Sequence, residues 1–455
     1  MWRLLFLVLP FSCWTQSSLN VLFLDNWKSE TIVATSDSLK YSDCWGHESQ
    51  GREYAMLGST EGVHVFEIVN DKFEERDFVV GNYSHPSVIH RDIKIYDHYA
   101  FTVCDEGTSS LQIIDLQYLP DSVHVVYEND STFTRVHNLF IDEPNKLLYV
   151  CSVQPSSGGI LQGLIPMQVY SISDILNPTL VYQGPADIPE VHDVYVRDNI
   201  AYLNCGFDGV RVYDFSNSSS PQFLQNFNFY QDQGYNHQGW LSPDGSKYVF
   251  GDETNGKKLK LCSVENNQID IEGNFGTNFL DESVAHNVMI TDEFAFVAYY
   301  NEGLRIYDIR HKLPKEIAHY DTYPEEEPLF KMNGAWGVFS ELPSERILVS
   351  DRKNGLFLLD FDRESFESAI PNDISIYPNP IIGEEFVIRL EEDREPTFIV
   401  DIYDMIGRTI YSETHVKANY AVINSPAVSG MYNVCISYPT EDGYEVVFDQ
   451  KIAVY

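Results

Sequence analysis

Hydrophobic and polar positions alternate in short runs along most of the chain, and polar turns separate the runs. Residues 191–215 read VHDVYVRDNIAYLNCGFDGVRVYDF, and residues 285–309 read AHNVMITDEFAFVAYYNEGLRIYDI, which aligns without a gap. Each stretch predicts three short strands, the last of them opened by an acidic residue and a glycine. No helical period persists, so the pattern predicts an all-β protein built from repeats.

The same pattern occurs seven times between residues 41 and 361, and a fourth alternating run follows each of the first six copies. Repeats of four short strands are typical of propeller blades. The seventh copy ends in LFLLDF without a fourth run, whereas the run LNVLFLDNW at residues 19–27 precedes the first copy. We therefore predict a seven-bladed β-propeller over residues 17–362. The N-terminal run is expected to supply the outer strand of the last blade, which closes the ring and removes two open edges.

The C-terminal region follows a different pattern. From residue 374 the repeats stop, and ISIYPNPIIGEEFVIRL, FIVDIYDMIGRTIY and SGMYNVCISY read as separate strands. They predict a small antiparallel β-sandwich over residues 374–455. The preceding residues, 363–373, predict a linker between two independent cores.

The N-terminus predicts export. Arg3 precedes a short apolar run that ends at Phe11, and small polar residues follow it. Such a run is too short to span a membrane and is typical of a secretory signal peptide, here residues 1–16. No other apolar run approaches membrane length, so we expect no transmembrane segment.

Charge narrows the choice of partners. The chain carries 30 Lys and Arg against 68 Asp and Glu, a formal net charge of −38. Such a surface repels nucleic acid and anionic lipid, and we exclude both as partners. Cys104, Cys151 and Cys205 end equivalent strands of different repeats. Because equivalent positions of separate repeats lie too far apart for easy bridging, we interpret them mainly as small buried residues and leave disulfide pairing open.

The repeat region resembles the LVIVD-repeat propellers called choice-of-anchor B proteins. The matching stretches include CWGHESQGREYAMLGS, RDIKIYDHYAF, VHNLFID, NHQGWLSPDG and NGAWGVFSELPSERILVSD, and they span about residues 41–361. The chain departs from the family at His90, where tryptophan is usual, and in the acidic stretch TYPEEEPLF. Because the activity of this family is poorly defined, the resemblance implies a fold and an export route more than a reaction.

The C-terminal region resembles a type A sorting domain of the type IX secretion system. The matching residues are Tyr377, Pro378, Asn379, Pro380, Gly407, Gly430 and Tyr432. The resemblance implies that the secretion machinery is a partner of this domain. It also implies transport through the periplasm to the outer cell surface or the extracellular space.

A column of imidazoles and indoles precedes the first strands of the repeats, and a polar column that includes Asp92 and Asp193 follows it. Since the first strand of a propeller blade is the innermost one, both columns are expected at one mouth of the central channel. The candidate binding ring is Trp45, Arg91, Asp92, His137, His192, Asp193, His237, His286 and Trp336.

Two interpretations of this ring are open. The residues can hold neighbouring blades in register through hydrogen bonds, which is the interpretation we favour. Alternatively, they can form a ligand or metal site, because neutral imidazole is a good ligand for transition metals. No tight His-x-His or His-Glu-x-x-His spacing occurs, so no metal site is assigned and no cofactor is expected with confidence. Ca²⁺ and Zn²⁺ are the candidate ions. Acidic runs that could bind Ca²⁺ are Asp187, Glu190 and Asp193, and Asp321, Glu325, Glu326 and Glu327.

No Gly-x-Ser-x-Gly, P-loop or Cys-x-x-Cys motif occurs in the chain, and no catalytic residue is assigned. We therefore favour a non-enzymatic binding module for an unknown extracellular ligand. The alternative is an extracellular hydrolase or lyase that uses His and Asp as acid and base at the channel mouth.

Overall fold

A computed structural model provides the structure of the protein. It describes residues 17–129, 132–155, 164–277, 283–310, 314–324, 332–363, 366, 374–383, 385–390, 397–416, 418–440 and 443–455. The predicted signal peptide and most of the predicted linker lie outside the described residues. The chain divides into two compact units, Met1–Asp362 and Arg363–Tyr455.

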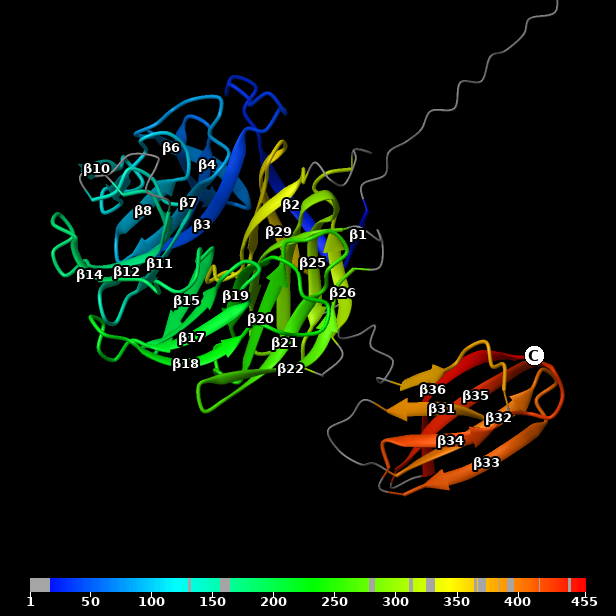
Figure 1. Ribbon diagram of the computed structural model, residues 1–455. Coiled ribbons are helices and arrows are strands. Elements are labelled where there is room, and N and C mark those ends of the chain that lie inside the picture. Colours follow the sequence, from blue (N-terminus) through cyan, green and yellow to red (C-terminus); the bar gives the residue numbers. More distant parts are fainter. Residues whose placement is uncertain are drawn as a thin grey trace, which may run out of the picture. The chain divides into compact units, whose positions relative to one another are not determined.

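Within its described residues, the first unit consists of seven blade-like antiparallel sheets and almost no helix (Figure 1). Six of the sheets take four strands each in chain order, β3 to β6, β7 to β10, β11 to β14, β15 to β18, β19 to β22 and β23 to β26, and β1 adds a fifth strand to the last of these six. The seventh sheet combines β27, β28 and β29 from the end of the unit with β2 from its start. The unit is therefore an all-β array of similar sheets, one for each sequence repeat.

The first strand of each sheet contacts the first strands of the two neighbouring sheets, and β27 of the last sheet contacts β3 of the first. These seven strands, here called the innermost strands, are β3 (Tyr41–Ser49), β7 (Arg91–Tyr96), β11 (Asn138–Asp142), β15 (Asp193–Arg197), β19 (Asn236–Leu241), β23 (Ala285–Ile290) and β27 (Ala335–Phe339).

The second and third strands are the most deeply buried, because neighbouring sheets cover both of their faces. Strand β16, for example, is buried at every residue, and Leu203 on it packs in one cluster with Tyr149 of the preceding sheet. Burial on both faces explains why these strands read as nearly continuous apolar runs. The second strands are β4 (Arg52–Ser59), β8 (Tyr99–Cys104), β12 (Leu147–Val153), β16 (Ile200–Asn204), β20 (Lys247–Asp252), β24 (Phe294–Tyr299) and β28 (Ile347–Asp351). The third strands are β5 (Gly62–Val69), β9 (Leu111–Asp115), β13 (Ile165–Ser171), β17 (Val210–Asp214), β21 (Leu259–Glu265), β25 (Gly303–Asp308) and β29 (Gly355–Phe361).

The fourth strands are the most exposed, and β10 has no buried residue. They are β6 (Lys72–Val80), β10 (His124–Asn129), β14 (Thr179–Gln183), β18 (Gln222–Phe227), β22 (Gln268–Phe275) and β26 (Lys315–Tyr320). In the last sheet, β2 (Val21–Trp27) occupies the fourth position and pairs antiparallel with β29. The short strand β1 (Ser18–Leu19) pairs with β26 of the preceding sheet. The N-terminal segment thus ties two sheets from the other end of the unit.

A glycine opens or directly precedes four of the third strands, namely β5, β17, β25 and β29, and this glycine has a steric reason. Gly303 has φ 76°, and a Cβ there would lie 2.2 Å from the carbonyl oxygen of Tyr320 on the fourth strand. At Gly355 a Cβ would lie 2.0 Å from the carbonyl oxygen of Trp27. Because no side chain fits against the neighbouring backbone, the acidic or amide residue of the turn is followed by glycine. Gly355 faces Trp27 as Gly303 faces Tyr320. Trp27 on β2 therefore occupies the position in the last sheet that Tyr320 on β26 occupies in the preceding sheet.

The second unit contains two antiparallel sheets within its described residues. One has the order β30, β31, β34, and the other has the order β33, β32, β35, β36. Their shared core includes Phe386, Ile388, Phe398, Ile402 and Ile436. The strands are β30 (Ile374–Tyr377), β31 (Glu385–Leu390), β32 (Phe398–Asp404), β33 (Thr409–His415), β34 (Tyr420–Asn424), β35 (Gly430–Thr440) and β36 (Gly443–Val454).

The cysteines in the described part of the chain are free thiols. Five of them are buried, and Cys435 is half-buried. Burial raises the pKa of the Cys151 thiol well above its usual range, so this thiol is unreactive at neutral pH.

Candidate functional site

Six aromatic side chains form a circle at one end of the innermost strands. Each precedes such a strand or belongs to its first two residues, so six of the seven repeats each place one ring here. We call this group the histidine ring: His90, His137, His192, His237, His286 and Trp336. The centroid distances between successive rings are 5.3, 4.2, 4.3, 4.3 and 4.3 Å, and 6.4 Å from Trp336 back to His90.

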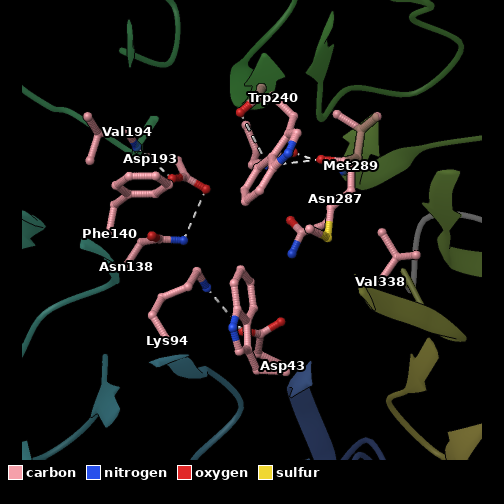
Figure 2. A pocket seen from close by; sticks show the side chains of 14 residues that line it. Asp43, Lys94, Asn138, Phe140, Asp193, Val194, Trp240, Asn287, Met289 and Val338 are labelled. Carbon is pink, nitrogen blue, oxygen red and sulfur yellow. Dashed lines mark hydrogen bonds and ion pairs between the residues drawn. The ribbon is translucent and has the colours of Figure 1, made fainter. Parts of the chain in front are cut away.

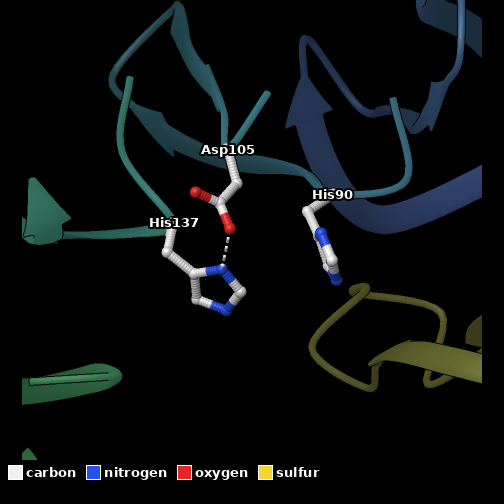
Figure 3. Close-up of side chains that lie close together, drawn as sticks. All are labelled: His90, Asp105 and His137. Atoms are coloured by element: carbon white, nitrogen blue, oxygen red, sulfur yellow. Dashed lines mark hydrogen bonds and ion pairs between the residues drawn. The ribbon is translucent and has the colours of Figure 1, made fainter. Parts of the chain in front are cut away.

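Four of the imidazoles use the Nδ1 atom for a hydrogen bond to an oxygen acceptor. His192 Nδ1 lies 3.1 Å from the carbonyl oxygen of His237, and His286 Nδ1 lies 2.7 Å from that of Trp336. His137 Nδ1 lies 2.9 Å from Asp105 Oδ2 (Figure 3), and His90 Nδ1 lies 2.9 Å from a Glu106 carboxylate oxygen. Since only an N–H group donates to such oxygens, the proton belongs on Nδ1. In the neutral form, Nε2 of each ring then carries a lone pair.

A carboxylate from a neighbouring turn faces the middle of the histidine ring. Glu253, just after β20, has its Oε2 atom 3.9 Å from His237 Nε2. Its Oε1 atom accepts a hydrogen bond of 2.5 Å from the Tyr300 hydroxyl. Nearby, the Tyr235 hydroxyl donates to Glu190. The tyrosines therefore hold the carboxylates in place at this end of the strands.

Burial divides the imidazoles into two electrostatic classes. Burial lowers the pKa of His192 and His286 well below the usual range of imidazole, and it lowers the pKa of His237 to about 4. For His137, burial acts in the same direction, but the hydrogen bond that it donates to Asp105 and the charges of Asp105, Asp92 and Glu253 together outweigh burial and raise the pKa. The neutral imidazoles of His192, His237 and His286 thus lie in the same ring as His137, whose imidazole binds a second proton more strongly.

Two groups of side chains bring three ligand atoms within 4.8 Å of one another. They are His90 with Asp105 and His137 (Figure 3), and His192 with His237 and Glu253. Both groups combine two imidazoles with one carboxylate, a donor set that suits a transition metal such as zinc.

Beyond the ring, the innermost strands of all seven sheets line a small cavity, which we call the channel interior (Figure 2). The free space is about 20 Å³, room for one or two water molecules. The lining residues are Asp43, Trp45, Lys94, Asn138, Phe140, Asp193, Val194, Gln238, Gly239, Trp240, Asn287, Val288, Met289 and Val338.

Polar groups of the channel interior bond mostly to one another. Lys94 Nζ lies 2.7 Å from Asp92 Oδ1 and 3.4 Å from Asp43 Oδ2. Asn138 donates to Asp193 at 3.1 Å. Burial raises the pKa of Asp193 to about 7, and Asp92 adds to the effect.

The structure places two of the expected ring residues elsewhere. Trp45 lies in the channel interior, where Lys94 Nζ is 4.2 Å from its ring centroid. Arg91 is buried and donates to the carbonyl oxygens of Ser59 and Tyr83. His90, which the sequence alignment passed over, takes the ring position before β7. Of the two aspartates, Asp193 lines the channel interior and Asp92 bonds to Lys94 beside it.

The register explains these displacements. The pairing of β3 with β4 shifts between Tyr41 and Cys44, so Asp43 rather than Gly46 faces Gly337 of the last sheet. Matching CWG in the first repeat to AWG in the seventh therefore misplaced Trp45.

Sequence reasoning also missed the carboxylates and tyrosines around the ring. In an antiparallel sheet the second strand ends where the first begins. The turn after each second strand therefore lies at the ring end and supplies Asp105, Glu106, Glu253 and Tyr300. Comparing these turns between repeats would have found them.

The expected Ca²⁺ ligands do not gather at one point. Asp187 pairs with Arg211 at 2.6 Å, while Glu190 and Asp193 have the separate partners given above. Asp321 accepts a hydrogen bond from the backbone amide of Tyr323. Glu325, Glu326 and Glu327 lie outside the described residues.

The motif residues of the second unit lie at strand ends. Tyr377 ends β30 and leads into Pro378, Asn379 and Pro380, and Asn379 accepts a bond from the amide of Ala453. Gly407, with φ 82°, forms the turn between β32 and β33. Gly430 begins β35, and the Tyr432 hydroxyl donates to the Val428 carbonyl at 2.6 Å.

Several solved structures are similar to the chain at low sequence identity. The computationally designed protein Ika8 has a TM-score of 0.45 and 9% identity, over 73% of this chain and 99% of that one. The extracellular domain of a hybrid two-component system protein from B. thetaiotaomicron has a TM-score of 0.47 and 10% identity, over 94% of this chain and 59% of that one. PorZ, a surface component of the type-IX secretion system of Porphyromonas gingivalis, has a TM-score of 0.44 and 13% identity, over 94% and 61%. No curated protein matches the chain.

Family comparisons assign two segments. Residues 284–322 match the LVIVD repeat, and this segment contains His286 of the histidine ring. Residues 375–445 match the secretion system C-terminal sorting domain. In the described residues, no helix is long and apolar enough to cross a membrane. The chain thus carries an LVIVD repeat and a sorting domain of the type IX secretion system, which directs it to the cell surface or the extracellular space.

Proposed function

We propose that the protein is a binding module of the cell surface or the extracellular space. In this proposal, residues 17–362 form a closed seven-bladed propeller, and the histidine-ring end is its ligand-binding face. Residues 1–16 act as the signal peptide, residues 363–373 as the linker, and residues 374–455 as the sorting domain.

Closure of the propeller is supported by the contact of β27 with β3 and by the pairing of β2 with β29. Deleting residues 19–27 would expose the edge of β29 and the side of β26 that pairs with β1. We expect the deletion variant to aggregate or to unfold at a much lower temperature. A monomeric variant with an unchanged melting temperature would contradict closure by the N-terminal strand.

The observation that carries the binding proposal is the set of unused acceptors in the histidine ring. Within the described residues, Nε2 of His90, His137, His192 and His286 has no hydrogen-bond partner. Such convergent acceptors, lined by aromatic walls, favour a ligand that brings hydroxyl donors or positive charge.

Exposed aromatic side chains extend this surface outwards. Phe207, after β16, is 76% exposed, and its ring centroid lies 5.3 Å from that of Tyr235. The Tyr235 ring is 5.4 Å from His192. An aromatic surface beside hydrogen-bond acceptors suits a neutral polysaccharide, since sugars present both hydroxyl groups and apolar faces. The strongly negative chain disfavours anionic polymers.

The test measures retention of the full mature chain on immobilised starch, xylan and mannan. Phe207→Ser should weaken binding about tenfold, because one central aromatic contact is worth 1 kcal/mol or more. Tyr118→Ser is the control, since Tyr118 is half-exposed in the β9–β10 turn at the opposite end of the strands. Failure of the wild type to bind any of these polymers, or equal losses in both variants, would overturn the proposal.

A hydrolase or lyase is the second candidate. It is favoured by the adjacent rings of His137 and His192, 4.2 Å apart, whose pKa values are shifted in opposite directions. Such pairs are typical of acid–base sites. Release of reducing ends or of unsaturated products from the retained polymer would favour this candidate over a binding module.

A further inference from the structure

We propose that His192, His237 and Glu253 form a zinc site in the histidine ring. The inference rests on the proposed function and deepens it, because it identifies the positive charge that the ring acceptors attract. The three groups come from the residue before β15, from β19 and from the turn after β20, and their ligand atoms lie within 4.8 Å of one another.

The geometry needs only small adjustments to hold an ion. Two ligand atoms bonded to one tetrahedral zinc at 2.0–2.1 Å are about 3.4 Å apart. His237 Nε2 and Glu253 Oε2 are already 3.9 Å apart. Since the other pairs of ligand atoms also lie within 4.8 Å, we infer that side-chain rotation can bring all three atoms onto one ion.

Two of the three ligands are also oriented by a second partner, as metal ligands usually are. His192 donates from Nδ1 to the carbonyl oxygen of His237, which leaves its Nε2 lone pair for the ion. Tyr300 occupies Oε1 of Glu253, so Oε2 is the oxygen that faces His237. Both contacts fix the ligand atoms before any ion arrives.

A buried polar atom gives an independent indication. His237 is 3% exposed, and its Nδ1 atom has no hydrogen-bond partner. The carbonyl oxygen of His286 is the backbone acceptor that interacts with the His237 imidazole. Binding of an ion at Nε2 requires the proton on Nδ1, and a small rotation towards His286 would satisfy this atom at the same time.

The other group, His90 with Asp105 and His137, fits an ion less well. Asp105 Oδ2 is already bonded to Nδ1 of His137 at 2.9 Å (Figure 3). An ion bound at Nε2 of His90 and Nε2 of His137 would therefore have two imidazole ligands and no carboxylate ligand.

The donor set selects the metal. Two imidazoles and one carboxylate are the ligands of open zinc sites, which keep a fourth position for an external group. Calcium requires six to eight oxygen ligands, and this group offers one carboxylate. In this proposal a hydroxyl oxygen of the polysaccharide occupies the fourth position.

The experiment measures metal binding by the full mature chain after dialysis against EDTA. Calorimetric titration with ZnCl₂ should show one tight site per chain, and Co²⁺ should give the visible absorption of a four-coordinate centre. Glu253→Gln keeps the shape of the side chain and should weaken Zn²⁺ binding by at least about tenfold. Glu106→Gln is the matched control, because Glu106 bonds to His90 of the other group, and it should bind Zn²⁺ like the wild type.

Three outcomes would overturn the zinc site: no tight Zn²⁺ binding by the wild type, wild-type binding by Glu253→Gln, or a loss confined to Glu106→Gln. Melting temperatures in EDTA identify variants that fail to fold, and His192→Gln then removes another ligand in place of Glu253→Gln. Absence of tight Zn²⁺ binding together with Phe207-dependent retention on polysaccharide would refute the zinc site and leave the proposed function intact. Tight Zn²⁺ binding without such retention would refute the proposed function alone.

Discussion

The histidine ring and the channel interior lie a few residues apart at the innermost strands, and they use polar groups in different ways. In the channel interior, Lys94 bonds to two carboxylates, and Gln238 bonds to both backbone groups of Val288 at 2.9 and 3.1 Å. In the histidine ring, each of four imidazoles uses Nδ1 alone. Lys94 and Gln238 use their polar atoms on protein partners and hold the sheets in register, whereas these four imidazoles keep an unused acceptor for a ligand.

The largest effect should come from Lys94, whose side chain is 11% exposed between two carboxylates that are 3% exposed. Lys94→Gln removes the charge that compensates Asp43 and Asp92, and a broken buried pair costs about 3–5 kcal/mol of unfolding free energy. Urea unfolding measures the loss. Lys146→Gln, at an exposed turn, should stay within about 0.5 kcal/mol of the wild type. A similar value for both variants would show that the interior pairing is dispensable.

Gln238→Ala should give the next largest effect. The substitution leaves the backbone amide and carbonyl of Val288 unbonded in a buried place, at a cost of about 1–3 kcal/mol. Gln268→Ala on the exposed β22 strand is the matched control. Thermal unfolding in EDTA compares the stabilities of the two variants. If Gln238→Ala were as stable as Gln268→Ala, the channel interior would not act as a structural network.

The pH dependence of stability provides a third comparison. Burial raises the pKa of Asp43 well above its usual range, although the facing Lys94 opposes the shift, and the facing Asp92 adds to it. A folded-state pKa above the unfolded one means that this contribution to stability is complete below the unfolded value. It is lost as the pH rises through the folded value. Asp43→Asn imitates the protonated form, keeps an acceptor for the Ile93 amide and gains a donor for Asp92.

We therefore expect Asp43→Asn to gain stability relative to the wild type as the pH rises from 5 to 8. Urea unfolding of both proteins at each pH gives the difference. A constant difference across this range would indicate that Asp43 stays ionised in the folded protein. Adding or removing Zn²⁺ should leave the difference unchanged, because the channel interior holds none of the proposed zinc ligands.

The sequence predicts the strands well because the repeat fixes three features at once. These are the alternation of the strands, the glycine that opens four of the third strands, and the place of the histidines. The resemblance of the last 80 or so residues to a sorting domain was likewise apparent from YPNP, Gly407 and the segment around Tyr432, and residues 375–445 confirm it. In the repeats and in the sorting domain alike, the local backbone requires particular residue types at particular positions. These residue types can therefore be recognised in the sequence.

The missing parts of the site have a different physical origin. Trp45 was misplaced because the irregular pairing of β3 with β4 changes which residues face the channel. His90 rather than Arg91 takes the ring position. The Arg91 side chain lies between the sheets, whereas the His90 side chain points towards the ring. Glu253 and Tyr300 reach His237 and its neighbours from turns 16 to 63 residues away in the chain. Register and spatial proximity of this kind are set by tertiary packing, which a repeat alignment does not contain.

The smallest effect should come from His137→Ala, and it tests whether the histidine ring holds the sheets together. Its main polar contact is the bond to Asp105, whose side chain is 29% exposed. Water can therefore replace the lost bond, and we expect a cost of about 0.5–1.5 kcal/mol of unfolding free energy in EDTA. That is well below the cost of Lys94→Gln, although Lys94 lies on β7 and His137 directly precedes the neighbouring strand β11. Zn²⁺ affinity should be retained, since His137 is not among the three proposed ligands. If His137→Ala instead destabilised the protein as much as Lys94→Gln, the ring would be part of the structural network. The distinction between paired and unused polar groups would then fail as a guide to the site.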